Sequence, residues 1–211
     1  MSTREATNRS VGGRISISRL IIGVTILAVS ICAGGSARAN NNEVRWDIIS
    51  LNFATLTISP GGHASAFAQN GSQIKLTGSG TFRSNSGTPQ DVTGGGNWTT
   101  YASDGITITG SGTYEATGFV SFVVAPGSVP QPPFVQNICS GCVPHSGLAM
   151  LRIEYSDGSE GVLVVSCHLP AGSPSTMPEG IAASKDFVDY WNIPTPVGGV
   201  DAGRTQFNFL P

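Results

Sequence analysis

Short runs in which apolar and polar residues alternate make up most of the chain after residue 40. Side chains on one face of a strand recur at every second position, so this alternation is typical of half-buried β-strands. Clusters of Gly, Pro, Asn, Asp and Ser separate the runs and mark turns. The pattern predicts strands over residues 44–53, 63–68, 74–82, 97–101, 106–114, 118–125, 148–155, 161–169 and 205–210.

Three further segments complete this prediction. Residues 156–159, Ser-Asp-Gly-Ser, predict a hairpin, because Asp-Gly tolerates the positive φ angles of tight turns. A weaker apolar run over 180–191 fits a strand better than a short helix beginning at Ser184, since Pro178 and strands flank it. The segment 125–144 holds five prolines, which predicts an extended loop that cannot lie inside a sheet.

A near-repeat with an offset of 32 residues is the clearest sign of strand structure. Residues 74–82 read Ile-Lys-Leu-Thr-Gly-Ser-Gly-Thr-Phe, and residues 106–114 read Ile-Thr-Ile-Thr-Gly-Ser-Gly-Thr-Tyr. With a period of two, each copy has one apolar face with two glycines and one face of hydroxyl groups. We expect each copy to be a strand that bends at its glycines and turns its apolar face, including Ile106 and Ile108, to the core.

The hydroxyl faces and the aromatic residues suggest a binding surface. Thr77-x-Ser79-x-Thr81 and Thr107-x-Thr109 would form ordered rows of hydroxyl groups that could meet a polysaccharide. Threonine also favours strands for reasons unrelated to binding. The largest aromatic residues would stack on sugars if they were exposed, whereas buried ones would anchor the core; they are Trp46, Trp98, Trp191 and Tyr190.

Residues 1–39 have the order of a secretory signal peptide. Four arginines lie between Arg4 and Arg19, the apolar run 20–33 follows, and Ala37-Arg38-Ala39 ends the segment. The apolar run has 14 residues, whereas a membrane-spanning helix needs about 20. We therefore expect a secreted or periplasmic protein cleaved after Ala39, with membrane contact only through an uncleaved signal segment. The fold class predicted is all-β, a single antiparallel sandwich or barrel-like domain over 40–211 after an N-terminal signal helix.

Charge narrows the range of partners. Without residues 1–39 the count of Lys and Arg falls from 11 to 6, and that of Asp and Glu from 13 to 12, which leaves a net charge of −6. An acidic surface repels phosphate backbones, so nucleic acid is excluded as a partner. A polysaccharide or another cell-surface component remains the candidate partner.

The cysteines allow two interpretations. The spacing Cys139-x2-Cys142-x2-His145, with Cys167 further on, provides thiolate and imidazole groups that could ligate zinc. Cys167 and His168 are neighbours in a predicted strand, so at most one of them could join that site. Export favours oxidation, and we therefore expect a disulfide, either Cys139–Cys142 or Cys142–Cys167. Cys167 is then the expected buried free thiol, and no cofactor is expected.

Catalytic motifs receive little support from the sequence. There is no Gly-x-Ser-x-Gly elbow, and His63 follows Pro-Gly-Gly in a predicted turn, where a solvated imidazole is expected. Glu154, Asp157 and Glu160 cluster near the predicted hairpin, where charges keep an exposed turn soluble. The sequence therefore favours an exported, non-catalytic binding or surface-associated module, with a glycan as a candidate ligand. The alternative is a small extracellular enzyme assisted by a metal in the Cys139 loop.

Four glycine-rich or apolar motifs carry a resemblance to known proteins. They are Gly-Ser-Gly-Thr-Phe (78–82), Val-Thr-Gly-Gly-Gly-Asn-Trp (92–98), Phe-Val-Ser-Phe (119–122) and Val-Val-Ser-Cys (164–167). Together they resemble a group of small secreted bacterial β-rich proteins of unknown function. That resemblance implies an exported β-rich domain and supplies no catalytic residues. Residues 108–118 also resemble the glycine-rich strand of allene-oxide-cyclase and dirigent-type barrels.

Overall fold

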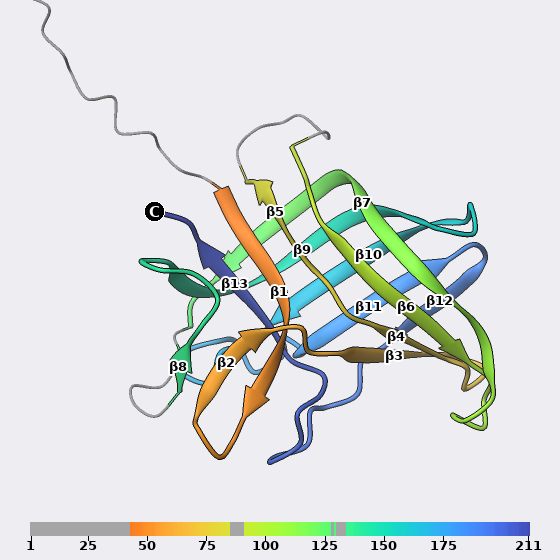
Figure 1. The fold of residues 1–211 in the computed structure, drawn as a ribbon, viewed down its shortest axis with the longest axis horizontal. Helices are drawn as coiled ribbons and strands as arrows, with labels where there is room; N and C mark the ends of the chain where they lie inside the picture. The colour runs from red at the N-terminus through yellow and green to blue at the C-terminus, as the bar shows by residue number, and fades with distance from the viewer. Residues whose placement is uncertain (1–42, 85–90, 128, 130–133) are drawn as a thin grey trace, which may run out of the picture. The chain divides into compact units, whose positions relative to one another are not determined.

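The computed structural model describes residues 43–84, 91–127, 129 and 134–211, which belong to one compact unit, Ala39–Pro211. These residues form thirteen strands and no helix (Figure 1). The strands are β1 (Glu43–Asn52), β2 (Thr57–Pro60), β3 (Ala64–Ala68), β4 (Gln73–Leu76), β5 (Ser79–Arg83), β6 (Gly95–Tyr101), β7 (Ile108–Ala125), β8 (Val135–Gln136), β9 (Val143–Tyr155), β10 (Glu160–Cys167), β11 (Gly180–Lys185), β12 (Val188–Asn192) and β13 (Thr205–Phe209).

The all-β prediction is confirmed for the described residues. The sheet is mixed, because β2 and β8 pair in parallel while the other strand pairs are antiparallel. The predicted signal helix over 1–39 lies outside the described residues. Among the residues that the structure describes, no helix has the length and apolar character needed to cross a membrane.

Strand pairing closes on itself in a ring of eight strands. The order is β9, β10, β11, β12, β3, β4, β6 and β7, and β7 pairs with β9 again along most of their length (Figure 1). A closed ring leaves no free strand edge among its members.

A second ring shares three of these strands. In it β1 pairs with β5 and β13, β5 meets β6, and β13 pairs with the beginning of β9. The strand β9 serves both rings: Val143–His145 pair with β13, and Gly147–Glu154 pair with β10. Residues from β1 and β13 are thereby held next to the end of β10, where the pocket described below is located.

The core contains a cluster of aromatic rings. Phe82 lies 5.0 Å from Phe119 and 5.0 Å from Phe122 between ring centroids, and Phe207 is 4.9 Å from Phe122. Trp46, Tyr114 and Tyr155 are also buried. Aromatic pairs at these distances add to the stabilisation from apolar burial, so this cluster holds β5, β7 and β13 together.

The first copy of the repeat behaves largely as predicted. Ile74, Leu76 and Phe82 are buried on one face, as the period of two requires. The strand is interrupted between β4 and β5, where Gly78 adopts a φ of +153°. At this interruption the Tyr114 hydroxyl donates a hydrogen bond to the Thr77 carbonyl over 2.8 Å. The predicted bend at a glycine is therefore confirmed in this copy.

The prediction for the second copy is wrong in two respects. Ile106 is 82% exposed and Ile108 is 61% exposed, so neither belongs to the core. The Asp104 carboxylate accepts hydrogen bonds from the backbone N–H groups of Ile106 and Thr107, which keeps Ile106 in the turn. The pairing of β6 with β7 also shifts between Thr100 and Tyr101. This shift changes which residues face inward.

The glycines of this copy do not break the strand, because β7 continues through both of them. They accommodate Trp98 of β6 instead: a Cβ on Gly110 would lie 2.9 Å from the indole ring, and one on Gly112 would lie 2.9 Å from its Nε1. The indole N–H donates to the Thr113 carbonyl over 3.1 Å. The two glycines therefore make room for a buried tryptophan.

The prediction of a hairpin at residues 156–159 is confirmed. Residues 156–159 connect β9 to β10, with Gly158 at a φ of +85°. The weak run over 180–191 is a second hairpin, β11 and β12, whose turn holds Asp186 at a φ of +52°. The segment is therefore strand and not helix, but it forms two strands joined by a turn where one strand was predicted.

The prediction for the proline-rich segment 125–144 is only partly correct. Ala125 ends β7, residues 135–136 form the short strand β8, and Pro144 lies in β9 opposite Asn208. A proline fits there because β9 pairs with β7 only from Ser146 onward, which leaves one side of Pro144 without a ladder partner.

Candidate functional site

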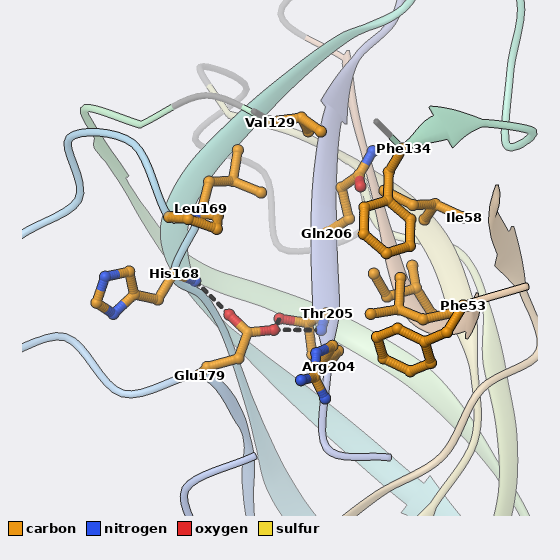
Figure 2. Close-up of a pocket in the computed structure, with 13 residues that line it drawn as sticks. Phe53, Ile58, Val129, Phe134, His168, Leu169, Glu179, Arg204, Thr205 and Gln206 are labelled. Carbon is orange, nitrogen blue, oxygen red and sulfur yellow. Dashed lines mark hydrogen bonds between the residues drawn. The ribbon is translucent and has the colours of Figure 1, made fainter. Parts of the chain in front are cut away.

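A pocket of about 290 Å³ lies where β1, β2 and β13 meet the residues that follow β10. This volume is close to the lower end of the roughly 300–1,000 Å³ typical of small-molecule sites. Figure 2 shows the side chains around it. Those that line the pocket are Ile49, Leu51, Phe53, Ile58, Val129, Phe134, His168, Leu169, Pro170, Glu179, Arg204, Thr205 and Gln206.

Most of the wall is apolar. Phe53 and Phe134 meet edge to face, with ring centroids 5.9 Å apart. Ile58 and Leu169 are buried, whereas Phe53 is 38% exposed, so the pocket reaches solvent beside Phe53. Such a wall favours an apolar ligand, because burying its surface releases water from both partners.

One carboxyl group lies in the wall. Glu179 accepts hydrogen bonds from the backbone N–H of His168 and from the backbone N–H of Thr205, the latter over 2.6 Å (Figure 2). Burial of this carboxyl raises the pKa of Glu179 to about 8, and the two backbone donors oppose the shift only in part. The carboxyl joins the residues that follow β10 to the start of β13.

Arg204 is the cationic residue of the pocket. Its guanidinium donates hydrogen bonds to the carbonyls of Val200 and Ala202, 3.1 and 3.0 Å away, and to that of Val197 over 3.2 Å. The guanidinium carbon lies 6.0 Å from the centre of the Phe53 ring. These contacts hold Arg204 at the rim, and its charge opposes the rise in the pKa of Glu179.

The ring of His168 does not point into the pocket. Its Nδ1 lies 2.8 Å from the Met177 carbonyl, and Figure 2 shows the ring on the opposite side of its backbone from Phe53 and Phe134. His168 therefore contributes its backbone N–H to Glu179 and no imidazole to the pocket.

The predicted cysteine residues separate into two groups. Cys139 and Cys142 form a disulfide with a Cα–Cα distance of 5.8 Å, one of the two pairings that we expected. Cys167 is the buried free thiol that we expected, and burial raises its pKa. His145 lies on β9 with its ring 4.6 Å from Phe209, and partial burial lowers its pKa. Within the described ranges, no three His, Cys, Asp or Glu side chains gather as metal ligands would.

The predicted hydroxyl rows are occupied by hydrogen bonds within the protein. The Thr81 and Thr93 hydroxyls lie 3.0 Å apart, and Thr109 donates to Thr100 over 2.9 Å. Thr77 Oγ1 accepts from the backbone N–H of Asn97 over 3.0 Å. These contacts give the rows a structural role in joining neighbouring strands.

The tryptophans differ in exposure. Trp46 and Trp98 are buried, Tyr190 is buried as well, and Trp191 is 51% exposed. Only a ring with an open face can stack on a sugar. Of the aromatic residues considered for glycan stacking, Trp191 is the one that keeps such a face.

The acidic cluster at the β9–β10 hairpin supports the turn. Asp157 pairs with Lys185 over 2.6 Å and also accepts from the Ser159 hydroxyl, which lowers its pKa to about 2. Glu154 and Glu160 face each other across the hairpin and are exposed. His63 is likewise exposed in its turn, as expected.

Sequence patterns missed the pocket entirely. Its walls come from residues within 49–58, 168–179 and 204–206, together with Val129 and Phe134. Each segment contributes residue types that are common in strands and loops and do not by themselves indicate a binding site. The one local signal was Glu179, an isolated acid directly before an apolar run, and nothing in the sequence indicated that it is turned inward.

Comparison with protein-family models, with curated proteins and with solved structures finds no match. The resemblance to small secreted bacterial proteins stays a prediction.

Proposed function

We propose that the protein is a non-catalytic binding module that holds a small, mainly apolar ligand in the pocket between Phe53, Phe134 and Leu169. The observation that carries this proposal is a cavity of about 290 Å³ with apolar walls and few polar groups. Such a combination is the usual form of a small-molecule site, in which apolar contacts supply affinity and the polar groups orient the ligand.

The wider setting of the module is also proposed. An exported protein, secreted or periplasmic and cleaved after Ala39, would carry this pocket on a single barrel-like domain. Its acidic surface would leave apolar burial, not charge attraction, as the main source of affinity. The sugar-binding alternative rests on Trp191 alone, because the other two tryptophans are buried.

The enzyme alternative has one observation in its favour. A carboxyl group with a raised pKa inside a pocket is a common feature of general acids and bases. However, the oxygens of Glu179 accept hydrogen bonds from the backbone N–H groups of His168 and Thr205. No second carboxylate stands among the described residues that line the pocket. These contacts favour a structural role for Glu179 over an acid–base role.

A fluorescence titration tests the proposal. N-phenylnaphthylamine becomes brighter in apolar surroundings, so it reports on occupation of the pocket. We expect saturable binding that is lost in Leu51→Trp, since Leu51 is a partly buried wall residue and a larger side chain would fill the cavity. The matched control is Val123→Trp on the outside of β7, which is 64% exposed and should leave binding unchanged. Equal binding to both variants would contradict the proposal.

A further inference from the structure

A chain of side-chain amides leads from the disulfide loop into the pocket wall. The Gln136 Nε2 group donates to the carbonyl of Cys142 over 3.1 Å. The Gln206 Nε2 group then donates to Gln136 Oε1 over 2.7 Å and to Asn208 Oδ1 over 3.0 Å. Gln206 is fully buried and is one of the residues that line the pocket (Figure 2).

This chain determines which way the Gln206 amide faces. A carbonyl oxygen only accepts hydrogen bonds, so the Cys142 carbonyl requires the nitrogen of Gln136 on its side. Gln136 must then present its oxygen to Gln206, which in turn must present its nitrogen. Turning the Gln206 amide around would place its oxygen against two other oxygens, those of Gln136 and Asn208.

The oxygen of Gln206 is left without a partner. Gln206 Oε1 is buried and accepts no hydrogen bond, although it belongs to a residue that lines the pocket. A buried acceptor that stays unpaired costs about 1–3 kcal/mol. A ligand that donates a hydrogen bond to this oxygen would remove that cost.

We propose that the ligand of this pocket is an apolar molecule with one neutral hydroxyl group, and that this hydroxyl donates to Gln206 Oε1. The proposal rests on the proposed function and adds the chemical class of the ligand. It assigns Gln206 as the residue that selects for the hydroxyl.

The charges around the pocket disfavour an ionised ligand. A carboxylate would place its oxygens against Gln206 Oε1 and near the Glu179 carboxyl, and neither can donate to it when Glu179 is ionised. Arg204 could attract an anion, but its guanidinium already donates to three backbone carbonyls at the rim. An ammonium group would share the pocket wall with the Arg204 charge. A neutral donor avoids both conflicts.

Competition with matched ligands tests this inference. Decanol, its methyl ether and decanoate share one chain and differ at the polar end, so they should displace N-phenylnaphthylamine with different affinities. We expect decanol to bind about tenfold more tightly than the ether, the ratio that one satisfied hydrogen bond gives. Decanoate at pH 9, where Glu179 is mostly ionised, should bind more weakly than decanol.

Substitution of Gln206 locates the effect. In Gln206→Leu the preference for decanol over the ether should fall to about onefold, because the unpaired oxygen is gone. Gln69→Leu changes an exposed glutamine outside the pocket and should keep the preference. The comparison of decanol with its methyl ether can be made on the unmodified protein alone. The inference can therefore be tested even if the Gln206→Leu variant folds poorly.

The outcomes separate the two proposals. Equal binding of decanol and the ether to the unmodified protein would overturn the hydroxyl inference while leaving the apolar pocket in place. Failure of both ligands and of the fluorescent probe to bind would instead contradict the proposed function itself.

Discussion

The carboxyl of Glu179 accepts a hydrogen bond from the backbone N–H of Thr205 over 2.6 Å, across 26 residues of sequence. Its other oxygen accepts from the backbone N–H of His168. The carboxyl group of Glu179 therefore connects the residue after β10 to the start of β13, and these contacts form part of the pocket wall.

Stability should fall as the pH rises from about 4.5 to 8 because of Glu179. Its folded-state pKa is raised to about 8, so in this range the folded protein binds a proton that the unfolded chain has released. The contribution of protonated Glu179 to the free energy of unfolding is fully present below pH 4.5 and is lost as the pH rises through 8. Its size is on the order of a few kcal/mol. Chemical denaturation across this range measures it.

The control for this prediction is Glu179→Gln, which removes the titrating group. Asp47, whose pKa burial also raises, remains in the variant, so only the difference between the two curves reports on Glu179. We expect the stability of the variant to depend less steeply on pH. Parallel curves for the two proteins would show that Glu179 titrates normally.

Gly96 should tolerate no larger side chain. A Cβ at this position would lie 2.0 Å from the Thr77 carbonyl oxygen, which belongs to the backbone at the break between β4 and β5. We expect Gly96→Ala to lower the free energy of unfolding by about 2 kcal/mol or more. Gly198→Ala is the matched control, since a Cβ there meets nothing within 4 Å. Similar stabilities for the two variants would mean that the strands separate easily here.

Much of the fold could be predicted because the inward faces of the strands follow the period of two. Val44, Trp46 and Ile48 are buried as the alternation in β1 requires. The same rule fails for Ile106 and Ile108, since a turn held by Asp104 and a register shift override it. Neither the turn nor the register shift can be predicted from the hydrophobicity of the surrounding residues.

The outward face of β1 and β13 shows why the pocket could not be predicted. By alternation Asp47, Gln206 and Asn208 should face solvent, yet all three are fully buried. Gln136 of β8 lies against Gln206, and Arg45 pairs with Asp47 over 2.7 Å. A short strand from a distant, proline-rich segment thus covers a polar face, which no pattern within β1 or β13 indicates.

Amide chemical-shift mapping of the purified protein with N-phenylnaphthylamine tests the central claim most directly, because it reports where a ligand binds. The account predicts that the largest shifts occur at Leu169, Thr205 and Gln206, which line the pocket, and that Trp191 and Phe187 do not move. Shifts concentrated at the exposed Trp191 and Phe187, or no shifts at saturating probe, would contradict it.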